Sequence, residues 1–208
     1  MTEEMEQRCM TAVCLDLEGV LVPEIWIAFA EASGIPELRR TTRDEPDYDK
    51  LMRFRIDILN DRHLGIDRIK SVIETIEPME GAREFLDSLR EKTQVIILSD
   101  TFTQFGMPLM RKLGYPTLLC NELVTDAEGR ITGYTLRAPH SKLATVKAFH
   151  SVGIETIAAG DSYNDLEMIR ASKAGFLFRS TEKIIKDNPD IPAFDDYGSF
   201  LDAITAAL

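Results

Sequence analysis

The chain has 208 residues, of which 44% are hydrophobic and 28% charged, so it can bury one core and still carry an insertion. Its formal net charge of -11 argues against nucleic-acid or anionic-membrane binding, because those partners need clustered Lys and Arg, and it favours a small-molecule substrate. No apolar run approaches the roughly 18 residues of a membrane-spanning helix, and the acidic N-terminus lacks a secretory signal, so we expect a cytoplasmic protein.

The first part of the chain predicts one strand followed by several helices. A short apolar strand, 12–15, ends at Asp16. Helical spacing of apolar residues follows over 24–33, and Gly34 and Pro36 supply a stop. Two more helical patterns are centred on 51–59 and 69–76. We therefore expect a helical insertion over 24–79, within a core formed by 1–23 and 80–208.

After Gly81 the pattern alternates between helix and strand. The expected helices and strands are, in chain order, a helix through 85–89, a strand at 95–98, a helix at 104–113, a strand at 117–120, a helix at 142–151, a strand at 156–159, a helix at 164–172 and a strand at 174–178. A β-hairpin is expected over 123–136, centred on 126–129. The sequence predicts an α/β fold, a doubly wound, Rossmann-like parallel sheet with an inserted helical cap and a β-hairpin.

Three of the predicted strands end in polar clusters. These clusters are Asp16-Leu-Glu18-Gly-Val20, Ser99-Asp100-Thr101 and Gly160-Asp161-Ser-Tyr-Asn164-Asp165. In an open parallel sheet, ligands bind beyond the carboxyl ends of the strands, so the three clusters should meet in one crevice.

The acidic residues of these clusters would repel one another unless a cation lies between them. Each close pair of like charges costs several kcal/mol at an effective dielectric of about 20. Carboxylate oxygens without nearby Cys or His favour Mg²⁺, which takes substrate phosphate as a further ligand. Ser99 could donate to phosphate oxygens, and Lys142, after Ser141 as a candidate N-cap, could neutralise their charge.

Each cluster alone has a simpler explanation. An aspartate at a strand end is more often a turn or cap residue than a nucleophile, and Lys142 alone would be a solvated surface charge. A signalling receiver also carries acidic residues at strand ends, and a non-catalytic binding module is a further alternative. The joint, ordered occurrence of the clusters favours an enzyme, and a receiver has no need for a helical insertion.

With these motifs the sequence resembles the haloacid dehalogenase superfamily of aspartyl phosphotransferases over nearly its whole length. Within it, the stretch DLEGVLVPEIWIAFA resembles the phosphoserine phosphatase group, and in particular its bifunctional phosphoserine phosphatase/homoserine phosphotransferase branch. Most family members have an aspartate where this chain has Glu18. The longer side chain fits that branch and leaves the balance between water and another phosphoryl acceptor open.

The resemblance implies a role for each motif residue. Asp16 would become an aspartyl-phosphate, and Glu18 would protonate the leaving alcohol and later deprotonate the acceptor. Mg²⁺ would be bound by Asp16, the backbone carbonyl of Glu18 and Asp161, with Asp165 supporting a metal-bound water. The phosphoryl oxygens would be held by Ser99, the amide of Asp100 and Lys142, and Asn164 would face the substrate.

The expected cap contains two candidates for recognising an amino acid. Glu24 could bind an ammonium group, and Arg55 could bind a carboxylate with its two-pronged guanidinium. Their simpler explanations are a helix-start acid and a solvated surface charge, and Trp26 is expected to be cap core. The favoured substrate is O-phospho-L-serine, with L-homoserine as a candidate acceptor; another small phosphate ester is the alternative. A homodimer is compatible with the resemblance, and residues 1–9 are expected to be an extension.

Overall fold

The computed structural model describes residues 10–41, 44–45 and 47–208, so the prediction for 1–9 lies outside the described residues. Within this part of the chain lies a seven-stranded sheet of order β4-β3-β2-β1-β5-β6-β7. All neighbouring strands are parallel except β3 and β4. The strands are β1 Met10–Leu15, β2 Gln94–Phe102, β3 Thr117–Thr125, β4 Ile131–Thr135, β5 Ile154–Gly160, β6 Ala174–Phe178 and β7 Ala193–Phe194. The predicted doubly wound α/β fold is confirmed.

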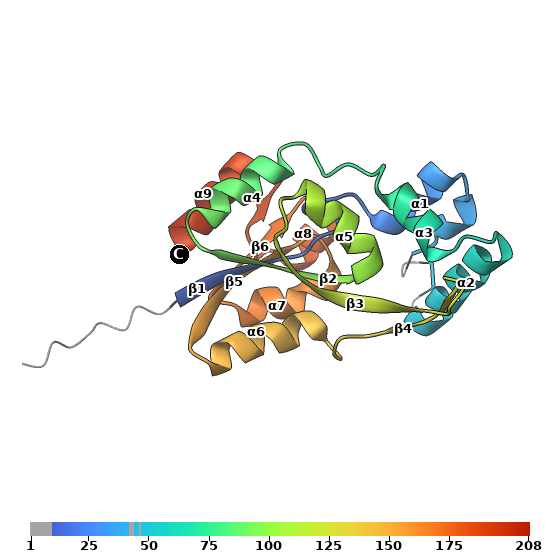
Figure 1. Ribbon diagram of the computed structural model, residues 1–208. Helices are drawn as coiled ribbons and strands as arrows, with labels where there is room; N and C mark the ends of the chain where they lie inside the picture. Colours follow the sequence, from blue (N-terminus) through green and yellow to red (C-terminus); the bar gives the residue numbers. More distant parts are fainter. Residues whose placement is uncertain (1–9, 42–43, 46) are drawn as a thin grey trace, which may run out of the picture.

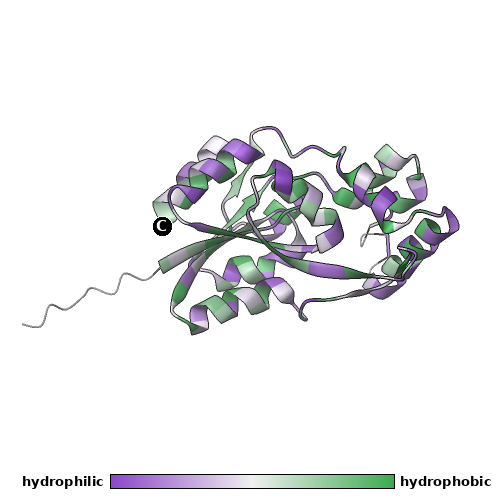
Figure 2. Cartoon of the chain, viewed as in Figure 1, coloured by the Kyte–Doolittle hydropathy of each residue, from purple (hydrophilic) through white to green (hydrophobic). Residues whose placement is uncertain are grey.

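Helices cover both faces of the sheet (Figure 1). One core cluster joins the sheet to α4 Ala82–Arg90, α5 Thr103–Lys112 and α9 Tyr197–Ala207. The other joins it to α6 Ser141–Ser151, α7 Leu166–Ala171 and α8 Glu182–Asp187. The strands between these layers are mostly apolar, whereas the outer helices alternate polar and apolar residues (Figure 2). Burial on both faces explains why β1 is an unbroken apolar run from Ala12 to Leu15.

The helices expected between the first strand and residue 80 are present at one end of the sheet (Figure 1). They are α1 Ile25–Ser33, a 3-10 turn at Pro36–Arg39, α2 Tyr48–Asp61 and α3 Ile66–Ile73. The first helix ends at Gly34, whose left-handed φ of 70° lets its amide reach the carbonyls of Ala30 and Glu31. We refer to this group of helices as the cap.

The β-hairpin differs from its predicted form. Its first arm is the continuation of β3 through Thr125, rather than a separate strand that begins at 123. The polar pair Asn121 and Glu122 interrupts the apolar run in the sequence but not the strand. The hairpin then reaches the cap, where the Asn60 side chain donates to the carbonyl of Ile131 at 2.9 Å, and the amide of Ile66 donates to the carbonyl of Gly129 at 2.8 Å.

Two predictions of local structure are wrong. Ser141 is the first helical residue of α6 rather than its N-cap; His140, with φ of 47°, occupies the cap position. The helix predicted at 164–172 is instead a 3-10 turn at Tyr163–Asp165 followed by α7 at Leu166–Ala171. The Ser162 and Asp165 side chains bond reciprocally to backbone amides and so cap this turn. The last three elements, α8, β7 and α9, lie beyond the final predicted strand and were not predicted. No helix in the described ranges is both long and apolar enough to cross a membrane.

Candidate active site

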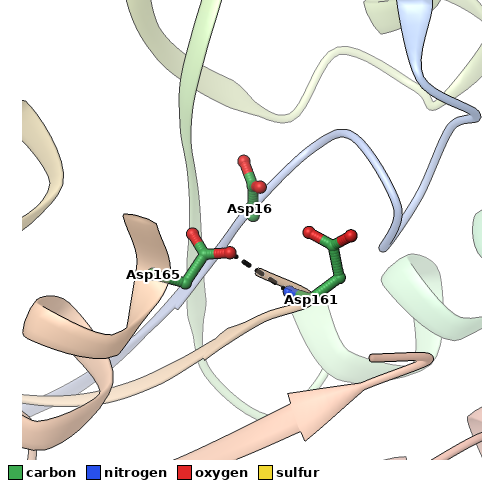
Figure 3. Close-up of side chains that lie close together, drawn as sticks. All are labelled: Asp16, Asp161 and Asp165. Atoms are coloured by element: carbon green, nitrogen blue, oxygen red, sulfur yellow. Dashed lines mark hydrogen bonds between the residues drawn. The ribbon is translucent and has the colours of Figure 1, made fainter. Parts of the chain in front are cut away.

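The carboxyl ends of β1, β2 and β5 bring the three polar clusters together. Asp16 directly follows β1, and its amide donates to the carbonyl of Ala159 in β5 at 2.9 Å. Asp16, Asp161 and Asp165 each offer a carboxylate oxygen, and these oxygens all lie within 4.8 Å of one another. Figure 3 shows the three side chains around a common space. The convergence follows from parallel strands that all end at the same edge of the sheet.

Two glycines allow this close approach. Gly19 has φ of 74°, and a Cβ built on it would collide with the carboxylate of Asp161. A Cβ on Gly160 would collide with the carboxyl group of Asp165. A side chain at either position would therefore displace one of the acidic groups.

Lys142, in the first turn of α6, places a positive charge among the carboxylates at the strand ends. Its Nζ lies 2.9 Å from Asp16 Oδ1, 2.7 Å from Asp165 Oδ1 and 4.0 Å from Asp100 Oδ2. Burial by itself disfavours the charged lysine, but the attraction of Asp16, Asp165 and Asp100 outweighs burial and raises the Lys142 pKa. Lys142 therefore remains an ammonium group at neutral pH.

Asp165 organises the loop after β5. It is fully buried, and its Oδ2 accepts the amides of Asp161 and Ser162 at 3.1 Å each, the first of which is drawn in Figure 3. Its other oxygen holds Lys142. Asp165 thus fixes both the position of Asp161 and the direction of the lysine.

The charges of this group fit a divalent cation. Three carboxylates and one ammonium leave two negative charges, since -3 + 1 = -2. Burial, followed by repulsion from Asp165, raises the Asp16 pKa well above its usual range. The same two causes raise the Asp161 pKa to about 6. A hard cation with oxygen ligands, as Mg²⁺ is, would relieve this repulsion, so the residues present fit a magnesium site.

The cluster at the end of β2 lies beside Lys142. Ser99 is buried, and its Oγ accepts the amide of Thr101 at 3.1 Å. Asp100 Oδ2 accepts the Asn164 side-chain amide at 2.9 Å. β2 continues through Phe102, beyond the predicted strand at 95–98, so this cluster lies in the last residues of the strand. The Asp100–Asn164 hydrogen bond joins it directly to the cluster after β5.

Asn121, a buried residue of β3, supports the site but was not predicted from the sequence. Its Nδ2 donates to the carbonyl of Asp100 at 2.9 Å, and its Oδ1 accepts the amide of Arg137 at 3.0 Å. It thereby connects the end of β2 with the segment that leads into α6. Its polarity inside a strand was a weak signal, because only the fold shows which face of β3 it occupies.

Glu18 connects the core to the cap. Its Oε1 accepts the amide of Ile25, the first residue of α1, at 2.6 Å. Burial, followed by repulsion from Glu24, raises the Glu18 pKa to about 7. Near neutral pH, Glu18 therefore exists in both protonated and ionised forms, which suits a group that gives and takes a proton.

The two cap candidates, Glu24 and Arg55, differ in exposure. Arg55 is 5% exposed and Glu24 is exposed. Burial lowers the Arg55 pKa to about 10, an effect opposed first by Tyr48 and then by the negative charges of Glu18 and Glu24. The charge of Glu24 also contributes to the raised pKa of Asp161. Glu24 thus interacts electrostatically both with Arg55 in the cap and with Asp161 in the core.

Known proteins support a relationship over most of the chain. The haloacid dehalogenase-like hydrolase family matches residues 10–173. A protein of Pseudomonas aeruginosa named phosphoserine phosphatase ThrH is 54% identical over 188 residues, covering 90% of this chain and 92% of that protein. A phosphoserine phosphatase of Pseudomonas syringae is 56% identical over 180 residues, covering 86% of this chain and 76% of that protein.

A solved structure described as a substrate-bound phosphoserine phosphatase complex shares the fold, with a TM-score of 0.76 at 22% identity, covering 93% of this chain and 98% of that one. The motifs at the strand ends, the inserted helices and these similarities agree. The chain belongs to the haloacid dehalogenase-like hydrolase family.

Proposed function

We propose that the chain is a Mg²⁺-dependent phosphatase that hydrolyses O-phospho-L-serine through a phosphorylated Asp16. The observation that carries the proposal is the buried group of Asp16, Lys142, Asp161 and Asp165 at the carboxyl ends of the strands. The choice of substrate rests on two relatives named phosphoserine phosphatase, at 54% and 56% identity. The inserted helices argue against the receiver alternative.

In the first step, a carboxylate oxygen of Asp16 forms a bond to phosphorus while the bond from phosphorus to the serine oxygen breaks. Glu18, in its protonated form, gives its proton to the leaving oxygen. Its raised pKa keeps a useful fraction protonated near neutral pH. Serine then leaves as the neutral alcohol.

Several groups hold the phosphoryl oxygens during this step. Lys142 stays charged and lies beside Asp16, and the Ser99 hydroxyl and the Asp100 amide donate hydrogen bonds. Asp16, Asp161 and the carbonyl of Glu18 would hold a magnesium ion, which would supply positive charge to neutralise the phosphate. Asp165 positions Lys142 and supports the surroundings of the metal, while Asn164 orients Asp100 and faces the substrate.

In the second step, a water oxygen attacks phosphorus, the bond to Asp16 breaks, and the ionised Glu18 takes the proton of the water. L-Homoserine in place of water would give O-phosphohomoserine by the same steps. Glu18 is one methylene longer than the family's usual aspartate and is bonded to the start of α1, so it differs at the position where the acceptor is activated.

The cap selects the amino acid in this proposal. Glu24 would bind the ammonium group and Arg55 the carboxylate. Arg55→Ala should raise the KM for O-phospho-L-serine about 10- to 100-fold, the loss expected for a charge-assisted hydrogen-bonded pair. A phosphatase for another small ester, without a carboxylate, would tolerate the change.

The deciding experiment measures phosphate release from O-phospho-L-serine with Mg²⁺, with and without L-homoserine. Wild type should release phosphate, and Asp16→Asn should reduce turnover on the order of 10⁴-fold or more, because the nucleophile is lost. O-Phosphohomoserine formed at the expense of phosphate would identify transfer. Cleavage of an aryl phosphate without any turnover of O-phospho-L-serine would exclude the proposed substrate.

The homodimer and the cytoplasmic location stay predictions from the sequence.

A further inference from the structure

Trp26 lies directly beneath the cap residue proposed to bind the substrate carboxylate. It belongs to α1 and is 8% exposed, as its expected place in the cap core requires. The guanidinium carbon of Arg55, from α2, lies 4.3 Å from the centre of its ring. Trp26 therefore contacts a charged group as well as apolar neighbours.

Arg55 is a buried cation with few partners. A guanidinium carries five N–H donors. Nη2 donates to the carbonyl of Arg40 at 2.8 Å, and Nη1 contacts the Met52 sulfur, a weak acceptor, at 3.8 Å. Among the described residues, Nε has no hydrogen-bond partner, and no carboxylate lies within ion-pair distance of Arg55. Part of the guanidinium edge is thus left for an acceptor that the described chain does not provide.

The Trp26 ring is anchored on the core side. Its centre lies 5.1 Å from that of Phe105, in an edge-to-face arrangement. Phe105 is fully buried in α5, the helix that directly follows the Ser99 cluster. Trp26 thereby contacts both Arg55 in the cap and Phe105 in the core, next to the residues proposed to hold the phosphate.

We propose that Trp26 is a positioning residue that fixes the plane of Arg55 for the substrate carboxylate, and so helps to set specificity for a phosphorylated amino acid. This inference rests on the proposed function. The ring attracts the cation and covers one face of the guanidinium. The N–H groups point outward in the guanidinium plane, so stacking leaves them able to bind a carboxylate through two parallel hydrogen bonds.

The kinetic test compares O-phospho-L-serine with O-phosphoethanolamine, which keeps the phosphate and the ammonium group but lacks the carboxylate. Trp26→Leu should lower the ratio of the two kcat/KM values, serine over ethanolamine, by about tenfold, the scale expected for losing a desolvated cation–π contact. The change should lie mainly in the KM for phosphoserine. Trp26→Phe, which keeps a ring, should restore part of the ratio.

Phe29→Leu is the matched control. Phe29 is also a buried aromatic of α1, and it packs against both Trp26 and Phe105. Phe29→Leu should change kcat/KM by the same factor for both substrates and leave their ratio unchanged. An equal loss on both substrates in Trp26→Leu, or the same change of ratio in Phe29→Leu, would show that Trp26 is only a packing residue.

A binding measurement keeps the proposal testable if Trp26→Leu does not fold. Trp26 is the one tryptophan of the chain, so its fluorescence reports directly on the contact between Trp26 and Arg55. In the full-length Asp16→Asn protein, O-phospho-L-serine should change this fluorescence saturably, and O-phosphoethanolamine should change it much less. Adding Arg55→Ala should remove the difference. Equal responses to both ligands, with binding followed separately by calorimetry, would overturn the inference.

The outcomes also separate this inference from the proposed function. Failure of wild type to turn over O-phospho-L-serine would overturn both. Turnover that depends on Arg55 but shows no substrate-selective effect of Trp26 would overturn only the role of Trp26.

Discussion

The two halves of the site differ in how their charges are compensated. On the core side, Lys142, Asp16 and Asp165 are each at most 5% exposed and joined by contacts of 2.7 and 2.9 Å. On the cap side, Arg55 is equally buried but has one strong acceptor, the carbonyl of Arg40. The core charges are fixed by one another before a substrate arrives, whereas the cap charge is not.

The two sides of the site therefore favour different parts of its proposed function. Dipoles and charges that are already oriented need no rearrangement when charge develops on the phosphate, so a rigid core side favours catalysis. A buried cation with open donors gains most from a ligand that completes its hydrogen bonds, so the cap side favours discrimination between esters. Four experiments test this contrast between the core side and the cap side.

The largest effect on stability is expected for Lys142→Met. Without the ammonium group, Asp16 and Asp165 would be buried beside each other uncompensated, which should cost about 3–5 kcal/mol of unfolding free energy at neutral pH. Denaturant unfolding without metal measures the loss. Lys147→Met, an exposed change in the same helix, should stay within about 0.5 kcal/mol. A similarly small loss for Lys142→Met would mean that the core charges are not interdependent.

Glu18→Gln tests the group that joins the two halves. The Gln carbonyl can still accept the amide of Ile25, so α1 should keep its start, but the proton donor is lost. Turnover of O-phospho-L-serine should fall about 10²- to 10⁴-fold. An aryl phosphate, whose leaving group needs little protonation, should still give a burst of one turnover. Glu31→Gln, on the exposed side of α1, is the control, and retention of full turnover by Glu18→Gln would contradict the assignment.

Metal binding should depend on pH through the core carboxylates. The Asp161 pKa is raised from its usual 3.8 to about 6, so the folded metal-free protein holds a proton that the unfolded chain has lost between these values. The contribution of Asp161 to the stability of the metal-free protein should therefore fall as pH rises from about 4 to 6. Mg²⁺ at ten times its Kd should raise the Tm by about 3–6 °C at pH 7.5 and by less at pH 5.

Differential scanning calorimetry of wild type and Asp161→Asn checks this prediction. The variant should lose most of the shift induced by Mg²⁺. A shift of equal size at both pH values would show that the carboxylates do not release protons when the metal binds.

The smallest effect should come from the contact between hairpin and cap. The Tyr134 hydroxyl donates to Asp49 Oδ1 at 3.0 Å near the surface. Tyr134→Phe should cost less than about 1.5 kcal/mol by thermal unfolding. Tyr134→Ala also removes the edge-to-face contacts with Tyr48 and Phe102 and should cost more. Equal effects of the two variants would locate the whole contribution in the hydrogen bond.

Much of the fold was predictable because its signals are local. The apolar runs of β1 and β5, the helical spacing in the cap and the stop at Gly34 all depend on residues near one another in the chain. The start of the hairpin was misplaced because a polar residue such as Asn121 can stay in a strand when another segment satisfies its amide. The N-terminal boundary of α6 was also misplaced by one residue. The C-terminal β7 has two residues, too few to give a periodic pattern.

The residue types at the strand ends can be read from the sequence alone, and with them the acidic cluster, the nearby lysine and the expected need for a cation. The tertiary structure alone decided how these charges pair: that Asp165 holds Lys142, that Glu18 receives the start of α1, and that Trp26 lies under Arg55. The physical reason is that pairing depends on distances of a few ångströms between segments far apart in the chain, and these distances are set by packing rather than by spacing along the sequence.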